Sequence, residues 1–173
     1  MFNPFKKTYA TDELEMLSFL SKLILFSSLT NDENALFLPH LHKRTYSKEE
    51  VVFLRNDPAH ALYILTAGEV VLTLDQDDTI EEITKLDKGS IFGETSLLMN
   101  KKRLVNAVTS SESATMYVLP QVSIRDIFNS NIKIKVKLLE AVANLYHDVN
   151  GDILKTYQNA RGFFYMSQVY NKK

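Results

Sequence analysis

The 173-residue chain contains no cysteine. This absence excludes a disulfide framework, a thiolate nucleophile and a zinc site with cysteine ligands, and it is typical of a reducing compartment, so we expect a cytoplasmic protein. Long apolar runs are also missing, because no stretch approaches roughly 18 uncharged apolar residues, and we expect no membrane-spanning segment. The apolar N-terminal stretch 16–29 is interrupted by Lys22 and predicts an amphipathic helix, not a signal peptide.

An excess of charge of one sign is absent as well. The net charge is −1 and the sequence pI is about 6.4, whereas a nucleic-acid-binding surface usually shows a basic excess. The hydrophobic share of 45% and the charged share of 24% are those of an ordinary globular protein. No Ser-His-Asp or paired-carboxylate arrangement stands out, so hydrolytic catalysis has no positive support in the sequence.

The spacing of apolar residues divides the chain into three zones. Residues 1–40 form an N-terminal helical segment, 41–119 a β-roll, and 120–173 a set of C-terminal helices. In the first zone, helical spacing predicts one helix that starts near Thr11 and continues through the following apolar positions: Leu14, Leu17, Leu20, Ile24 and Leu25. Residues 30–32 break this pattern.

The middle zone alternates apolar and polar residues with the period of two that is typical of strands. The alternating positions are Val52/Leu54, Leu62/Ile64, Val70/Leu72/Leu74 and Ala114/Met116/Val118. Three of the five glycines fall here, at positions 68, 89 and 93, as tight connections between strands require. Many short strands at this spacing predict a mainly β fold, a double-stranded β-helix or jelly roll, flanked by α-helices.

The third zone returns to helical spacing after Pro120. Residues 131–137 alternate throughout and are also compatible with a strand, but we favour a helix because apolar residues continue at spacings of four, three and four. These residues are Leu138, Val142, Leu145 and Val149. They form a seam of about two heptads, enough for a core stripe or a homodimer contact. Gly151 and Gly162 are expected to punctuate the tail.

The segment 91–103 carries the chemistry. Gly93 opens a short segment that begins with Glu94, Thr95 and Ser96, and Arg103 follows after a loop, at the expected start of the next strand. The free N–H groups at the start of a helical turn attract an anion, and an arginine binds a phosphate with two parallel donors. A carboxylate suits such a site only if it accepts hydrogen bonds from a group attached to the phosphate, such as a ribose hydroxyl.

This pattern resembles the phosphate-binding cassette of the cyclic-nucleotide-binding family, which includes the catabolite activator protein and the regulatory subunits of cyclic-AMP-dependent kinase. The resemblance extends from about Leu25 to Val149 and includes the cassette, residues 92–104, and the strand–glycine–strand segment 61–70. It implies that Glu94 holds the ribose 2′-hydroxyl and that Arg103 holds the cyclic phosphate. The remaining ligand-binding positions that it implies are Gly93, Thr95, Ser96 and Leu104 in the cassette, and Leu72, Ile83 and Leu86 around the purine and ribose.

The family likeness implies a binding module and not an enzyme: a sensor for a cyclic nucleotide, with cyclic AMP favoured over cyclic GMP, that needs no cofactor and signals through its C-terminal helix to a protein partner or a second subunit. Leu104 departs from the family pattern, in which Ala, Ser or Thr usually follows the arginine. It removes a hydroxyl that favours cyclic GMP, and its bulk crowds the purine unless a strand turns it to the opposite face. About 20 residues follow Gly151, too few for a winged helix, so DNA binding is not expected.

Three alternatives stay open at this stage. Glu94 and Arg103 are also compatible with a structural ion pair in a domain that has lost its ligand and serves as an interaction module. His40 and His42 form a His-x-His pair that a cupin-type metal protein would use, although no metal site is expected. The aromatic tail, residues 162–170 together with Tyr157, is expected to pack on the domain or on a dimer partner, with a lid over the purine or a docking patch as the alternatives.

Overall fold

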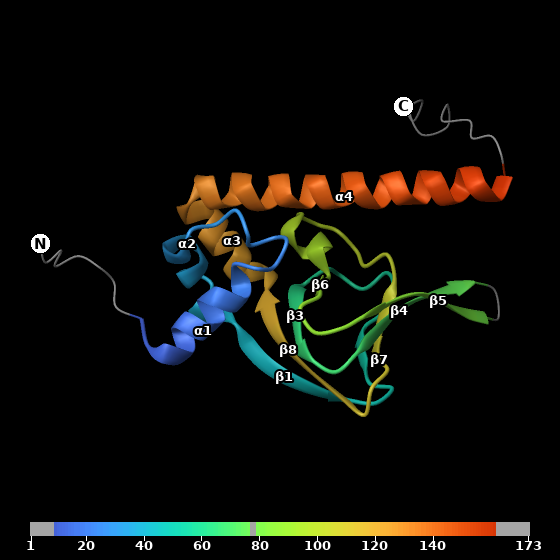
Figure 1. Cartoon of the computed structure of the whole chain (residues 1–173), viewed down its shortest axis with the longest axis horizontal. Helices are drawn as coiled ribbons and strands as arrows, with labels where there is room; N and C mark the ends of the chain where they lie inside the picture. Colours follow the sequence, from blue (N-terminus) through green and yellow to red (C-terminus); the bar gives the residue numbers. More distant parts are fainter. Residues whose placement is uncertain (1–8, 77–78, 162–173) are drawn as a thin grey trace, which may run out of the picture.

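The computed structural model describes residues 9–76 and 79–161 as two antiparallel four-stranded sheets with helices at one end and along one side (Figure 1). The strands are β1 (His42–Ser47), β2 (Val51–Phe53), β3 (Ala61–Ala67), β4 (Val70–Gln76), β5 (Thr79–Leu86), β6 (Ile91–Phe92), β7 (Asn106–Thr109) and β8 (Ser113–Pro120). The helices are α1 (Thr11–Leu20), α2 (Asn31–Ala35), η1 (Leu38–His40), η2 (Glu94–Leu97), α3 (Gln121–Ser130) and α4 (Ile132–Arg161). The predicted jelly roll with flanking helices is confirmed.

The two sheets have the strand orders β1-β8-β3-β6 and β2-β7-β4-β5. Strand β3 separates two apolar cores, because the period of two sends alternate side chains to opposite faces. Tyr63 and Leu65 point into the roll, where they meet the second sheet. Leu62 and Ile64 point outward and pack under the helices. Both faces of β3 are therefore buried, and the helices are fixed to the roll through the same strand.

The first helix ends at Leu20, so the prediction that it continues to Leu25 is wrong. Residues 20–29 form successive tight turns instead, in which the N–H groups of Leu23, Phe26 and Leu29 each donate to the carbonyl three residues earlier. The apolar residues here recur at a spacing of three, which matches these turns, and the side chains of Leu23, Phe26 and Leu29 are all buried. The break at residues 30–32 is a new helix start, because Thr30 Oγ1 accepts from the Glu33 amide and caps α2.

The C-terminal zone contains two helices. Pro120 precedes α3, which buries Ile124, Ile127 and Phe128 on one face. The second helix, α4, spans 30 residues and continues through Gly151, so the expected break there is wrong. Figure 1 shows α4 running from α3 along the roll and past β4. No helix in the described ranges is long and apolar enough to cross a membrane.

A half-buried ion pair joins α2 to α4. Lys137 Nζ lies 2.6 Å from Glu33 Oε2, and this hydrogen bond is the main cause that lowers the pKa of Glu33 below its ordinary value of 4.5. A carboxyl group whose pKa is lower in the folded state stabilises the fold above its unfolded pKa, and that stabilisation is lost as the pH falls through the folded value. The pair therefore links the fold to pH in the acid range.

We expect Lys137→Met to lower the free energy of unfolding by about 0.5–1 kcal/mol at pH 7, as for a partly exposed pair. The difference from the unmodified chain should shrink as the pH falls below 4.5, the ordinary value at which Glu33 of the unfolded chain takes up a proton, and should vanish below the lower pKa of the folded state. Urea unfolding at pH 7, 5 and 3 measures this difference in the free energy of unfolding. Lys155→Met is the matched control, because it breaks a fully solvated pair with Asp152 and should change little. A difference that is constant with pH would contradict this assignment.

Candidate functional site

A cavity of about 340 Å³ lies where η2, the segment before β7, strands β4 and β5, and helix α4 meet. Its polar side chains are Glu94, Thr95, Arg103, Thr84 and the hydroxyl of Tyr146; the rest of the lining is apolar or backbone. The cassette residues and the C-terminal helix, far apart in the sequence, therefore face the same space. A mostly apolar cavity with a few convergent polar groups is typical of a small-molecule site.

Gly93 sets the geometry of the cassette. Its φ of 75° lies in the left-handed region, which lets the chain leave β6 and enter η2 at once. A Cβ at this position would lie 2.6 Å from Arg103 Nη1 and 3.1 Å from the carbonyl oxygen of Ala61. Glycine is therefore needed both for the backbone turn and for the space that the guanidinium occupies.

Arg103 is 3% exposed and is held by main-chain carbonyl groups. Its Nη2 donates to the Ala61 carbonyl at 2.6 Å, and its Nη1 donates to the Gly93 carbonyl at 2.9 Å. The guanidinium carbon lies 4.2 Å from the centroid of the Phe53 ring, a cation–π contact. These contacts fix the orientation of the guanidinium at the wall of the cavity.

The charge of Arg103 has no ion-pair partner among the described residues, and its Nε has no hydrogen-bond acceptor there. Burial lowers the pKa of the guanidinium, while Tyr63 and Glu94 act in the opposite direction. A buried cation without a paired anion is unfavourable. This wall of the cavity is therefore suited to an anion.

Glu94 does not pair with Arg103, so the structural ion-pair alternative is wrong. Instead, Glu94 Oε1 accepts a hydrogen bond of 3.0 Å from the hydroxyl of Tyr146 on α4. Burial, followed by the nearby Glu94 carboxylate, raises the pKa of Tyr146. The hydroxyl thus stays protonated and remains a donor, and it ties the C-terminal helix to the cassette across the cavity.

Two of the three predicted purine-lining residues lie in the cavity wall. Leu72 comes from β4 and Ile83 from β5. The pairing shifts here, with Leu72 opposite Thr84 and Thr73 opposite Glu82, so Ile83 is the extra residue of a bulge. Leu86 is not part of this lining; it pairs with Val70 and packs against the core inside the roll.

Leu104 lines the same cavity and is 69% exposed. The expectation that Arg103 starts a strand is wrong, because β7 begins only at Asn106. Residue 102 makes an isolated bridge with Pro58, and residues 103–105 are irregular. The period of two therefore does not apply, and Leu104 stays at the cavity rim instead of turning to the opposite face.

The remaining cassette residues divide between two sides of η2. Thr95 lines the cavity, with its Oγ1 at 3.5 Å from Arg103 Nη1. Ser96 is buried and does not line this cavity; its Oγ has no partner among the described residues. The short 3-10 helix thus turns Ser96 away from the cavity that Thr95 faces.

The cavity-lining residues that sequence analysis missed include one each on α4, β2 and β5: Tyr146, Phe53 and Thr84. Tyr146 was not singled out, whereas Leu145 and Val149 were assigned to a core stripe or dimer contact and line the cavity. Phe53, which stacks with Arg103, was not identified either. Spacing along α4 showed one apolar face, but not which half of the helix packs on the core and which half covers a cavity.

The histidine pair gives no metal centre. No group of three or more His, Cys, Asp or Glu side chains in the described part of the chain is placed to hold a metal ion. His40 belongs to η1 and His42 to β1. The aromatic residues 162–170 lie outside the described residues.

Comparisons with known proteins identify the family of this chain. A sequence model described as the cyclic nucleotide-binding domain matches residues 43–131. The type II regulatory subunit of cAMP-dependent protein kinase from Drosophila melanogaster is 30% identical over 99 residues, which cover 57% of this chain and 25% of that protein. The chain thus spans about a quarter of the length of this relative.

Two solved structures share the fold. The catabolite activator protein of Thermus thermophilus matches with a TM-score of 0.65 and 24% identity, over 80% of this chain and 65% of that one. The regulatory domain of Toxoplasma gondii PKA, crystallised with cAMP, matches with a TM-score of 0.62 and 20% identity, over 72% and 46% of the two chains. The family match spans more than half of the sequence, and the chain belongs to the cyclic nucleotide-binding domain family.

Proposed function

We propose that this chain is a regulatory module that binds cyclic AMP in the cavity between the cassette and α4. The observation that carries this proposal is the buried guanidinium of Arg103, which faces the cavity without an ion-pair partner among the described residues. A cyclic phosphate would supply the missing anion, and the planar guanidinium offers it parallel donors. The first amides of η2, at Glu94 and Thr95, have no intrahelical acceptors and add donors on the same side.

Glu94 would bind the sugar. Its carboxylate has two oxygens, and the contact with Tyr146 uses Oε1. The second oxygen can accept a hydrogen bond from a ribose 2′-hydroxyl. Leu72, Ile83 and Leu104 would then surround the purine with apolar contacts. Ser96 would contribute to ligand binding only as part of the backbone of η2. Leu86 would contribute indirectly, because it packs against the core inside the roll behind the cavity.

The walls around the purine favour adenine over guanine. Apart from Thr84, the side chains there are apolar, and guanine carries one more exocyclic polar group than adenine, so guanine would lose more hydrogen bonds to water without gaining partners. Isothermal calorimetry with both nucleotides tests the proposal. We expect cyclic AMP to bind about tenfold or more tightly than cyclic GMP, which corresponds to about 1.4 kcal/mol. Absence of heat with either nucleotide would favour a ligand-free interaction module instead.

The output would pass through α4. Leu145, Tyr146 and Val149 contribute to the cavity, so a bound ligand contacts this helix directly and can shift its position only through such contacts. Two apolar side chains one helical turn apart at the start of α4, Ile132 and Val136, also remain exposed. We propose that this exposed face contacts a second subunit. A molar mass that stays monomeric at all concentrations in sedimentation analysis would refute the dimer.

Tyr146→Phe tests the role of the helix. The Tyr146–Glu94 hydrogen bond forms only when α4 covers the cavity, so its loss should lower the population of the covered arrangement and the apparent affinity with it. We expect cyclic AMP to bind roughly fivefold more weakly, about 1 kcal/mol, as for one hydrogen bond. Tyr117→Phe on β8, outside the cavity, is the matched control. Tighter binding by Tyr146→Phe would mean that Tyr146 competes with the ribose.

A further inference from the structure

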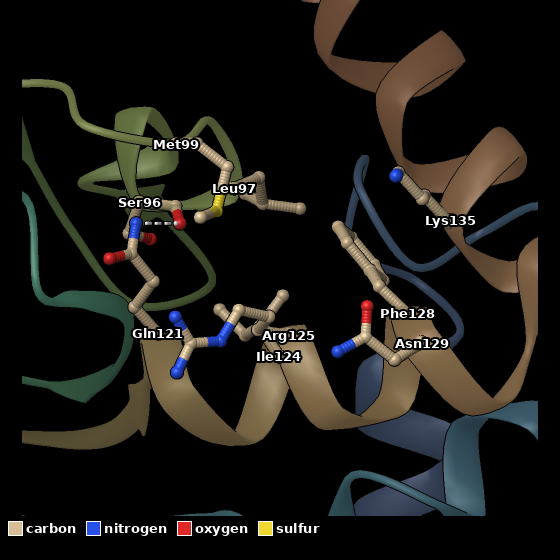
Figure 2. A pocket seen from close by; sticks show the side chains of 9 residues that line it. All are labelled: Ser96, Leu97, Met99, Gln121, Ile124, Arg125, Phe128, Asn129 and Lys135. Carbon is tan, nitrogen blue, oxygen red and sulfur yellow. Dashed lines mark hydrogen bonds between the residues drawn. The ribbon is translucent and has the colours of Figure 1, made fainter.

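A second pocket of about 250 Å³, drawn in Figure 2, is lined by Ser96 and Leu97 of η2 and shares no lining residue with the ligand cavity. Its walls come from the cassette and from helices α3 and α4. Figure 2 shows Leu97 and Met99 on one side, with Phe128 facing them from α3. The side chain of Met99 is 56% exposed, although the floor of the pocket is formed by buried residues such as Ile124. An apolar floor with an exposed methionine is typical of a surface that accepts another chain.

The rim of this pocket is basic. Arg125 of α3 and Lys135 of α4 both line it, and neither makes an ion pair with another described residue. Asp126, the acidic residue of α3, is not part of the lining. In Figure 2 the ammonium group of Lys135 extends from α4 toward the gap. A partner would therefore need apolar side chains for the floor and carboxylates for the rim.

The pocket shares a wall with the proposed ligand site. Gln121 Nε2 donates to the carbonyl oxygens of Ser96 at 2.8 Å and Leu98 at 3.1 Å, which ties α3 to η2. The other side of this four-residue helix contributes Glu94 and Thr95 to the ligand cavity. A ligand that shifts η2 must therefore also change the shape of the second pocket.

We propose that this pocket, defined by Leu97, Met99, Arg125, Phe128 and Lys135, is the docking site for an acidic, amphipathic segment of a partner protein. Its apolar side chains would fill the floor while its aspartates or glutamates pair with the two cations. The regulatory part of this inference, in which cyclic AMP alters the docking, rests on the proposed function. The docking surface itself does not depend on the proposed function.

The ends of this chain are unsuited to the same pocket. Residues 1–8 and 162–173 contain lysines but no aspartate or glutamate. They would place cations beside Arg125 and Lys135, which is repulsive. Charge complementarity thus favours an acidic partner over either of these two segments.

The experiment is a selection of random 16-residue peptides, displayed on phage, against the full chain. We expect enriched sequences to combine carboxylates with apolar residues at helical spacing. A synthetic peptide of the enriched sequence should lose at least tenfold in affinity for the double variant Arg125→Glu, Lys135→Glu. The double variant Lys43→Glu, Arg44→Glu on β1 makes the same change in net charge elsewhere and should bind the peptide normally.

Other outcomes would overturn the docking site. These are a selection without enrichment, enrichment of basic sequences, or equal binding by both double variants. Binding of a synthetic peptide of residues 162–173 to the pocket would assign it to this chain's own tail. Calorimetry with cyclic AMP on the Arg125→Glu, Lys135→Glu variant is run in parallel, because neither residue lines the ligand cavity. Loss of peptide binding with normal nucleotide binding separates this inference from the proposed function.

Discussion

Arg103→Ala is expected to weaken the binding of cyclic AMP from about 30-fold to several thousand-fold, or about 2–5 kcal/mol. This range is that of removing one partner of a buried charged contact. The structure supports such a large effect because Arg103 is the one cation among the described residues that line the cavity. Calorimetry on the purified variant measures the change directly.

The same substitution should also destabilise the fold. It leaves the carbonyl oxygens of Gly93 and Ala61 without their donors and opens space beside the Phe53 ring. Each unpaired buried acceptor costs about 1–3 kcal/mol, although removal of a buried charge offsets part of this. Circular dichroism must therefore establish that the variant is folded at the temperature of the titration.

Two further variants isolate the phosphate contact. Arg103→Lys keeps the charge but loses the planar fork, so its affinity should fall between those of Arg103→Ala and the unmodified chain. Arg44→Ala removes an exposed arginine from β1, far from the cavity lining, and should bind normally. Unchanged affinity in folded Arg103→Ala would reject the role of this guanidinium in phosphate binding.

Much of the roll could be predicted from the sequence because strand alternation is a local property. The positions Leu62/Ile64 and Ala114/Met116/Val118 all lie in strands of the structure. The cassette was predictable for a related reason, since Gly93 and the residues after it form one continuous segment. Both features depend on residues that are neighbours in the sequence, so both can be predicted from it.

The parts of the site that escaped prediction depend on tertiary geometry. The bulge at Ile83 changes which residues of β5 face the cavity, and nothing in the alternation marks it. Tyr146 reaches Glu94 only because α4 lies along η2, which depends on how α3 and α4 pack on the roll. A hydroxyl 52 positions away along the chain cannot be assigned to a carboxylate by spacing alone.

The most direct test of the cassette geometry is Gly93→Ala, which adds a single methyl group. In Gly93→Ala the new Cβ would meet Arg103 Nη1 at 2.6 Å, while the Ala61 carbonyl oxygen at 3.1 Å blocks the other direction. The backbone carbonyl cannot move without disturbing β3, so the guanidinium must move. We expect cyclic AMP binding to weaken by at least tenfold and stability to fall by about 1–3 kcal/mol from backbone strain alone.

Gly89→Ala separates backbone strain from displacement of the arginine. Gly89 also has a positive φ, 94°, but an added Cβ there would have no atom within 4 Å. Its substitution should cost about 1–2 kcal/mol of stability through the left-handed backbone and leave the ligand affinity unchanged. If both alanine variants bind cyclic AMP as tightly as the unmodified chain, the position of Arg103 does not control binding. If only Gly93→Ala loses the ligand, the cause is the space between η2 and the guanidinium, because strain in the turn is common to both variants.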